Sequence, residues 1–126
     1  MTKYDASYDP PAPIAEIALR NFETGEKIKN IFALLDTGAD ISLLPSRVVK
    51  SLNIDPLSEH IKLIGFDNKN DLFELYELQV IFLGKRFYGN YCVIDDETGI
   101  IGRDILNQIS ITFDGINLEW KEQNTL

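Results

Sequence analysis

The chain contains little of what cysteine-dependent and many metal-dependent enzymes use, because its 126 residues include one cysteine, Cys92, and one histidine, His60. A lone cysteine excludes an intrachain disulfide, and a single histidine leaves no His/Cys cluster for zinc. Cys92 lies in the apolar run Tyr91-Cys-Val-Ile94, where a small buried side chain is expected rather than a nucleophile. No serine has the sequence setting of a nucleophile elbow. We therefore expect no metal and no cofactor, which leaves catalysis by carboxylates.

Long apolar runs and clusters of positive charge are also missing. No apolar run is long enough to span a bilayer, and the N-terminal residues lack the apolar core of a signal peptide. The 12 Lys and Arg residues are scattered and the net charge is −8, which disfavours nucleic acids and anionic membranes as partners. Length and a hydrophobic content of 44% fit one globular domain. We expect a cytoplasmic protein.

Alternating apolar residues, interrupted by turn residues, predict a mostly β domain over residues 14–120. Residues 1–13 contain three prolines and are expected to form an extended or partly disordered arm, and residues 121–126 a polar tail. The expected strands are 14–20, 26–35, 41–44, 61–66, 71–83, 86–94, 100–101, 109–113 and 116–120, and the expected helices are 46–53 and a short one within 103–108.

The most informative stretch is Ile31–Pro45, in which Asp36-Thr-Gly38 lies between two apolar runs. A carboxylate in such surroundings is costly to bury unless it is hydrogen-bonded or shares a proton. Thr37 can supply a hydroxyl, and Gly38 lets the chain turn so that its N–H approaches the carboxylate. Asp-x-Gly is also common in type I turns, so a plain turn between strands is the alternative. Such turns usually lie among polar residues, unlike this one.

Two separated segments, Leu35-Asp-Thr-Gly-Ala-Asp40 and Ile100-Ile-Gly-Arg-Asp104, resemble the signature segments of retropepsin-like aspartic proteases. This family includes retroviral and retrotransposon proteases. The order of elements between the segments agrees as well, so the resemblance extends over about residues 14–120. It implies the acid protease fold, a closed and partly barrel-like β structure with one short helix in its C-terminal half and a flap hairpin.

The resemblance assigns roles to the first segment. Asp36 would be the catalytic aspartate. Thr37, Gly38 and Ala39 would support the active-site loop, with Thr37 forming hydrogen bonds across a dimer axis. Gly38 would offer its carbonyl and allow the substrate backbone to approach closely.

In the second segment, the resemblance implies that Arg103 forms a structural ion pair with Asp40 and holds the short helix beneath the active-site loop. Gly102 would allow this helix to pack against the strand that carries Asp36. The simpler alternative for Gly102 and Arg103 is core packing next to a surface arginine.

A hairpin over residues 61–73 would be the flap that closes over a bound peptide. Its tip, Asp67-Asn-Lys-Asn70, is polar where many relatives have glycines and apolar residues, and the chain ends do not match retroviral terminal strands. Phe66 and Trp120 fit packing better than substrate contact. The residues assigned to the flap are Ile64, Gly65, Phe66, Asp67 and Asn68.

Hydrolysis by carboxylates needs a base to activate water and an acid to protonate the carbonyl oxygen, which two carboxylates sharing one proton supply together. The sequence has no second Asp-Thr-Gly or Asp-Ser-Gly. Phe113-Asp-Gly115 lacks the hydroxyl residue, and Glu23-Thr-Gly25 and Glu97-Thr-Gly99 carry Glu in polar loops. The second carboxylate is therefore expected from the Asp36 of a second copy in a two-fold homodimer.

The sequence thus predicts an aspartic endopeptidase, a homodimer that hydrolyses peptide bonds in extended polypeptide substrates through a water held by two Asp36 carboxylates. The alternative is a catalytically inactive protease-like module for dimerisation or for peptide binding by strand addition. The acidic loop Asp95-Asp-Glu97 is expected to be a solvated turn, with weak calcium binding as its alternative.

Overall fold

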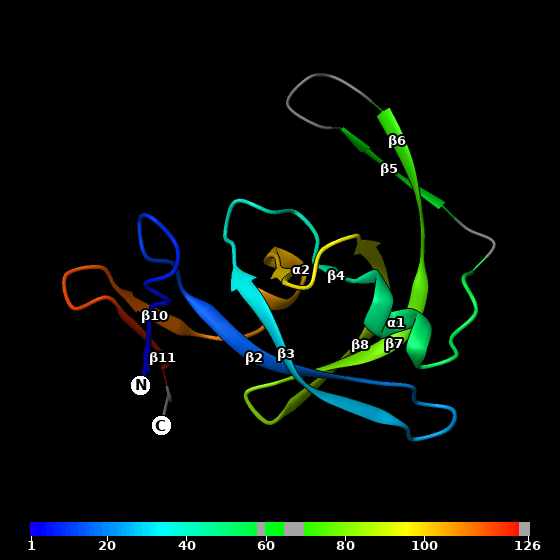
Figure 1. The fold of residues 1–126 in the computed structure, drawn as a ribbon, viewed down its shortest axis with the longest axis horizontal. Helices are drawn as coiled ribbons and strands as arrows, with labels where there is room; N and C mark the ends of the chain where they lie inside the picture. Colours follow the sequence, from blue (N-terminus) through cyan, green and yellow to red (C-terminus); the bar gives the residue numbers. More distant parts are fainter. Residues whose placement is uncertain (58–59, 65–69, 124–126) are drawn as a thin grey trace.

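The computed structural model describes residues 1–57, 60–64 and 70–123. Six of the β-strands form a closed barrel, and the others form two small sheets beside it (Figure 1). Two short helices pack against the barrel. None of the described helices is long and apolar enough to cross a membrane. The elements are β1 (Thr2–Lys3), β2 (Ile14–Arg20), β3 (Lys27–Leu35), β4 (Leu43–Pro45), α1 (Ser46–Ser51), β5 (His60–Ile64), β6 (Asn70–Glu74), β7 (Tyr76–Phe82), β8 (Lys85–Ile94), β9 (Gly99–Ile101), α2 (Arg103–Leu106), β10 (Ile111–Asp114) and β11 (Glu119–Glu122).

The barrel closes in the order β2-β3-β9-β4-β8-β7. Strand β9 lies between β3 and β4, parallel to β3 with Leu35 beside Ile101 and antiparallel to β4 with Leu43 beside Ile100. This arrangement brings the two motif segments together although nearly half of the chain lies between them. The end of β3 and the start of α2 therefore meet at one end of the barrel.

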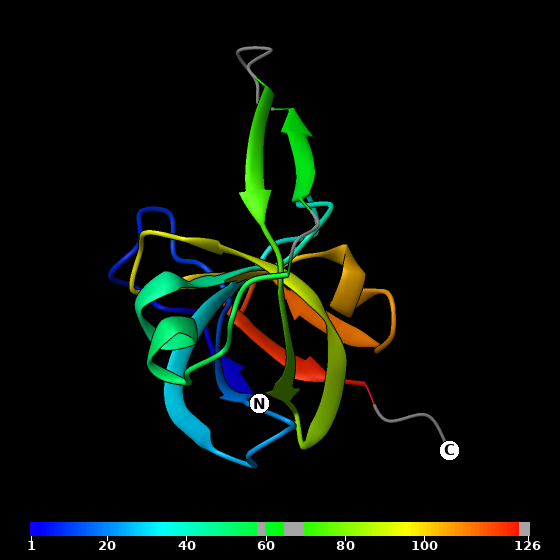
Figure 2. The ribbon, with the colours of Figure 1, turned by 90° about the vertical axis from the view of Figure 1, so that its right-hand side faces the viewer.

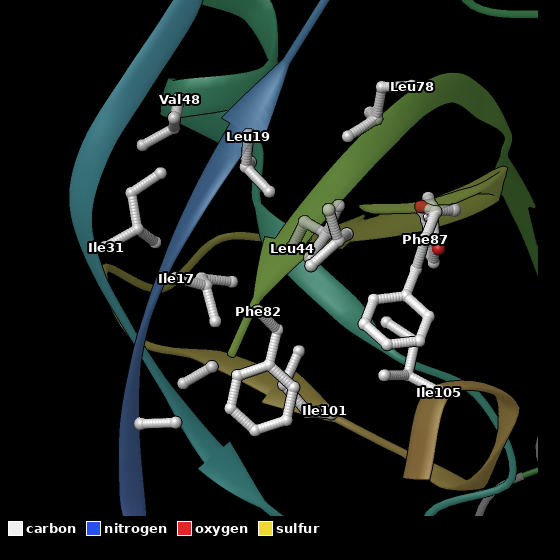
Figure 3. Packing of buried hydrophobic residues seen from close by; sticks show 14 of the residues in the cluster. Ile17, Leu19, Ile31, Leu44, Val48, Leu78, Phe82, Phe87, Ile101 and Ile105 are labelled. Carbon is white, nitrogen blue, oxygen red and sulfur yellow. Dashed lines mark hydrogen bonds between the residues drawn. The ribbon is translucent and has the colours of Figure 1, made fainter. Parts of the chain in front are cut away.

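The barrel interior is filled by the inward-facing side chains of the alternating strands. In β7, Tyr76, Leu78, Val80 and Phe82 are buried while the residues between them are partly exposed, as period two requires. Aliphatic side chains from β2, β3, β4 and the helices complete the packing (Figure 3). Trp120 closes one end, with its ring 6.0 Å from that of Phe82 and its indole N–H donating to the Ile14 carbonyl.

Among the residues that the structure describes, strands β5 and β6 pair with each other alone, from His60 opposite Glu74 to Ile64 opposite Asn70. Figure 2 shows this hairpin projecting from the barrel. The sequence predicted one strand over 71–83, but it is divided at Leu75, whose side chain is buried and whose carbonyl accepts the Leu57 N–H. The hairpin itself was predicted. The tip residues assigned to the flap, Gly65, Phe66, Asp67 and Asn68, lie outside the described residues.

Both chain ends differ from the expected elements. Thr2 and Lys3 form β1 and pair with β11, which gives a three-stranded sheet in the order β1-β11-β10. Strand β11 covers 119–122 instead of 116–120, because the Asp114 carboxylate accepts the N–H groups of Ile116 and Asn117 and holds the preceding residues in a turn. The predicted strand was therefore placed too early.

Candidate active site

Asp36 follows directly on β3, in a tight turn at the end of that strand. Its N–H donates to the Ile101 carbonyl at 3.0 Å, which extends the β3–β9 pairing by one residue. The Gly38 N–H donates to Asp36 Oδ1 at 2.9 Å, and the Ala39 N–H donates to the Asp36 carbonyl at 3.2 Å. These bonds fix the direction of the carboxylate relative to the barrel.

The Asp36 loop is open to solvent in the single chain. Asp36 is half-buried, whereas Thr37 and Gly38 are exposed. The apolar flanks suggested a more buried carboxylate, but those flanks point into the barrel and leave the turn itself on the surface.

Arg103, the first residue of α2, contacts the loop at three places. Its N–H donates to the Ala39 carbonyl at 2.9 Å, its Nη1 donates to the Thr37 carbonyl at 2.8 Å, and its Nη2 forms an ion pair with Asp40 Oδ1. The side chains of Arg103 and Asp40 are 42% and 82% exposed, so the ion pair itself contributes little to stability. The contacts to carbonyl groups are the ones that fix the shape of the loop.

Gly102 is where the second motif meets the loop most closely. A Cβ at this position would lie 2.6 Å from the Ile41 carbonyl oxygen and 2.9 Å from that of Ala39. The close approach is thus to the backbone of the segment that follows Asp36, and a larger residue would push α2 away from it.

Ser42 and Asp104 also belong to this site, although neither was assigned from the sequence. Ser42 is buried, its N–H donates to Asp104 Oδ2 at 3.0 Å, and its hydroxyl donates to Oδ1 at 2.6 Å. The same hydroxyl accepts the Gly102 N–H at 2.9 Å. The available signal was a serine inside the apolar run Ile41-Ser-Leu-Leu44.

The Asp104 carboxylate also affects the pKa of two side chains in β8. Burial first, and then the Asp104 carboxylate, raise the pKa of the Tyr91 hydroxyl and of the Cys92 thiol above their ordinary values. A raised pKa keeps Cys92 in the protonated thiol form, which is a poor nucleophile. Cys92 therefore has the structural position expected of it.

The other acidic segments that resemble the motif form local contacts of their own. Glu97 forms an ion pair with Arg47 at 2.6 Å, and Asp114 accepts backbone N–H groups of its own turn. In the Glu23-Thr-Gly25 segment, the backbone N–H of Glu23 donates to Asn21 at 3.0 Å, within a surface turn. These segments lie in surface loops away from the junction of the two motifs, where Asp40 is paired with Arg103, Asp104 is bonded to Ser42, and Asp36 lies in the loop between them.

A crevice of about 180 Å³, lined by both polar and apolar side chains, lies next to the Asp36 loop. Thr37 and Arg103 form the side toward the loop, and β10 contributes Ile111 and Phe113. The remaining lining residues are Leu106, Asn107 and Ile109. The crevice joins the active-site loop to the C-terminal hairpin on one face of the molecule.

A closed β barrel with Asp-Thr-Gly at the end of one strand and Gly-Arg-Asp below it defines a single-domain aspartic protease fold. The family model described as retroviral aspartyl protease matches residues 12–114, so the chain belongs to this family. Among solved structures, EIAV protease complexed with the inhibitor HBY-793 aligns with a TM-score of 0.58 and 22% identity, over 77% of this chain and 86% of that chain. A comparison with curated protein sequences gives no match. The predicted family and fold are confirmed.

Proposed function

We propose that the protein is a homodimeric aspartic endopeptidase that cleaves peptide bonds in extended polypeptides. The observation that carries this proposal is the position of Asp36, at the end of β3 in an exposed loop held by Arg103. The family to which the chain belongs consists of aspartyl proteases. One Asp-Thr-Gly in each chain makes the site incomplete without a second copy.

The proposed reaction uses the Asp36 carboxylate of each subunit. When the pair shares one proton, the ionised carboxylate takes a proton from a water molecule. At the same time the oxygen of that water attacks the scissile carbonyl carbon. The protonated carboxyl gives its proton to the carbonyl oxygen, and a tetrahedral diol forms. The proton taken from water then passes to the amide nitrogen as the C–N bond breaks. One diol hydroxyl returns its proton to the other carboxylate, so that an amine and a carboxylic acid are released and the pair again shares one proton. Thr37, Gly38 and Ala39 position this pair.

We assign the β5–β6 hairpin as the flap that covers the substrate. Figures 1 and 2 place this hairpin on the same side of the barrel as the loop after β3. A peptide held between the hairpin and the loop would lie extended, because an extended backbone can pair its N–H and C=O groups with neighbouring strands.

The test is an Asp36→Asn variant assayed with an unstructured peptide library. This substitution keeps the size of the side chain and removes its ability to take up a proton, so cleavage is expected to fall to background while the dimeric mass in ultracentrifugation is retained. Asp95→Asn, in the exposed acidic loop, is the matched control and should cleave normally. Pepstatin should inhibit the wild-type protein.

Unchanged cleavage by the Asp36→Asn variant would refute the proposal. Peptide binding by the wild-type protein without any turnover would instead support the inactive binding module. A pH–rate profile that rises steadily into the alkaline range would also contradict a pair that must hold one proton.

A further inference from the structure

The peptide group between Ile101 and Gly102 is hydrogen-bonded at both of its ends. Its carbonyl accepts the Asp36 N–H at 3.0 Å, and its N–H donates to the Ser42 hydroxyl oxygen at 2.9 Å. The single proton of that hydroxyl then goes to Asp104 Oδ1, at 2.6 Å. One chain of three hydrogen bonds therefore runs from the backbone of Asp36 to the carboxylate of Asp104.

All donors in this chain point in the same direction, from Asp36 toward Asp104. In such a chain each bond polarises the next, so that the bonds strengthen one another. The last acceptor is a carboxylate, and a hydrogen bond to an ionised acceptor is stronger than one between neutral groups. The negative charge of Asp104 thus makes the Ile101 carbonyl a better acceptor for the Asp36 N–H.

The Asp104 carboxylate is surrounded by donors. Besides the Ser42 hydroxyl, it accepts the Ser42 N–H at 3.0 Å and the Ile105 N–H at 3.0 Å. Three donors suit an ionised carboxylate, which can only accept. Asp104 is exposed, so water also solvates its charge. The middle of the chain is shielded, because Ser42 is 1% exposed and Ile101 is 0% exposed.

Arg103 and Asp104, which are adjacent at the start of α2, hold different parts of the active-site loop. Arg103 Nη1 donates to the carbonyl of Thr37, the residue after Asp36. The chain from Asp104 instead reaches the N–H of Asp36 itself. On the side-chain end, Asp36 Oδ1 accepts the Gly38 N–H at 2.9 Å. A shift of the Asp36 backbone would therefore displace the carboxylate from the position that this loop gives it.

We propose that Asp104 is a positioning residue for peptide hydrolysis, which holds Asp36 in its catalytic position through the buried Ser42 hydroxyl and the peptide group bonded to it. The inference rests on the proposed function, in which Asp36 is the catalytic group. It adds to that function one carboxylate in each subunit that acts through other groups rather than on the substrate. Loss of its charge lowers the rate of the chemical step and leaves substrate binding nearly unchanged.

The test is an Asp104→Asn variant of the full chain. Asn has nearly the same size but no charge, and its NH₂ group must face one of the donors that the carboxylate accepts. Asp5→Asn is the matched control. Asp5 also accepts the N–H and the hydroxyl of one serine, Ser7, at 2.9 Å and 2.7 Å, but it lies in the N-terminal arm outside the chain.

Steady-state kinetics separate positioning from stability, when they are measured at a concentration at which ultracentrifugation shows only dimer. For Asp104→Asn we expect kcat to fall by about tenfold or more while KM changes little. Asp5→Asn should have the wild-type kcat. A lower unfolding free energy of Asp104→Asn with a normal kcat would mean that Asp104 is merely structural, and would overturn the proposal.

Amide NMR of isotopically labelled protein reads the chain without any turnover. In Asp104→Asn the Asp36 amide proton should move upfield and exchange faster with solvent, because its hydrogen bond is weaker. The Leu35 amide is the internal control, since it donates to the Pro13 carbonyl at 2.9 Å and has no part in the chain. An Asp36 amide that does not change would also overturn the proposal.

Ser42→Ala breaks the chain in the middle and leaves Asp104 in place. It should change kcat and the Asp36 amide in the same direction as Asp104→Asn does. The double variant should lose no more activity than the more impaired single variant, because both substitutions interrupt one chain. Losses that multiply would mean that the two residues act separately, which contradicts the proposal.

The outcomes distinguish this inference from the proposed function. If the wild-type protein cleaves peptides in an Asp36-dependent manner and Asp104→Asn has a normal kcat, the inference alone is refuted. A wild-type protein that cleaves no peptide refutes the proposed function, and with it a role of Asp104 in catalysis.

Discussion

Ser42 and Asp104 are joined by two hydrogen bonds, from the Ser42 N–H to Oδ2 at 3.0 Å and from the Ser42 hydroxyl to Oδ1 at 2.6 Å. These bonds connect the segment after the active-site loop to α2. Because the hydroxyl also accepts the Gly102 N–H, one buried side chain satisfies groups on both motif segments. The position of Asp36 thus depends on a contact that lies behind the loop.

Removing the Ser42 hydroxyl is expected to destabilise the protein more than an ordinary surface substitution. Ser42→Ala leaves the Gly102 N–H without its partner, which costs about 1–3 kcal/mol of unfolding free energy for a buried donor. Chemical denaturation measures this loss, with Ser46→Ala, at the half-buried start of α1, as the control. Equal stability of the two variants would mean that the hydrogen bond contributes nothing.

A methyl group at position 102 is expected to separate α2 from the active-site loop. Gly102→Ala places a Cβ 2.6 Å from the Ile41 carbonyl oxygen, and the strain of such overpacking is typically about 1–3 kcal/mol. Gly115→Ala is the control, since a Cβ there has no neighbour within 4 Å. Thermal unfolding should show a lower midpoint for Gly102→Ala only, and a normal midpoint would contradict the close contact.

Substitution of Arg103 is expected to reduce activity more than stability. The Arg103–Asp40 pair is exposed, and such pairs contribute about 0–1 kcal/mol. The bond from Nη1 to the Thr37 carbonyl, however, shapes the loop beside Asp36. Arg103→Lys keeps the charge but cannot contact the Thr37 carbonyl and Asp40 with two guanidinium nitrogens at once. We therefore expect kcat/KM to fall while the unfolding free energy changes by less than about 1 kcal/mol. Asp40→Asn, which removes only the ion pair, should retain more activity than Arg103→Lys.

The raised pKa of Tyr91 predicts that the folded protein loses stability in alkaline solution. Its pKa is raised in the folded state, so between the ordinary value of about 10 and the folded value the unfolded chain loses a proton that the folded chain keeps. The contribution of Tyr91 is therefore complete below about pH 10 and declines above it by about 1.4 kcal/mol per pH unit.

The measurement compares Tyr91→Phe with the wild-type protein across this range. At neutral pH the variant lacks the hydrogen bond from the Tyr91 hydroxyl to the Phe87 carbonyl and should be about 1 kcal/mol less stable. Above pH 10 this difference should shrink and reverse. Tyr8→Phe, at an exposed ring, is the control, and a difference independent of pH would contradict the prediction.

The sequence predicted the barrel strands because their alternation is strong, as in β7. It identified the family because the residues of each motif segment are contiguous. It did not reveal the break at Leu75, since β6 and β7 share one apolar pattern. Strand β1 was missed because a strand of two residues is too short to show an alternating pattern of apolar and polar side chains.

The Ser42–Asp104 contact was beyond the reach of sequence patterns for a different reason. The two residues are 62 positions apart and meet only once β9 has inserted between β3 and β4. The serine inside an apolar run was a signal, but nothing in the local sequence identifies Asp104 as its partner. The hairpin turn after β10 was misplaced because the Asp114 carboxylate, rather than the apolar pattern, decides where it ends.

The central claim is that one active site needs an Asp36 from each of two chains. The most direct measurement adds increasing amounts of the Asp36→Asn protein to a fixed amount of wild-type protein, under conditions that allow subunits to exchange. Mixed dimers carry one carboxylate, so peptide cleavage should decline in proportion to the wild-type fraction of the total chains. Cleavage that stays constant as the variant is added, while mass spectrometry shows mixed dimers, would contradict the account.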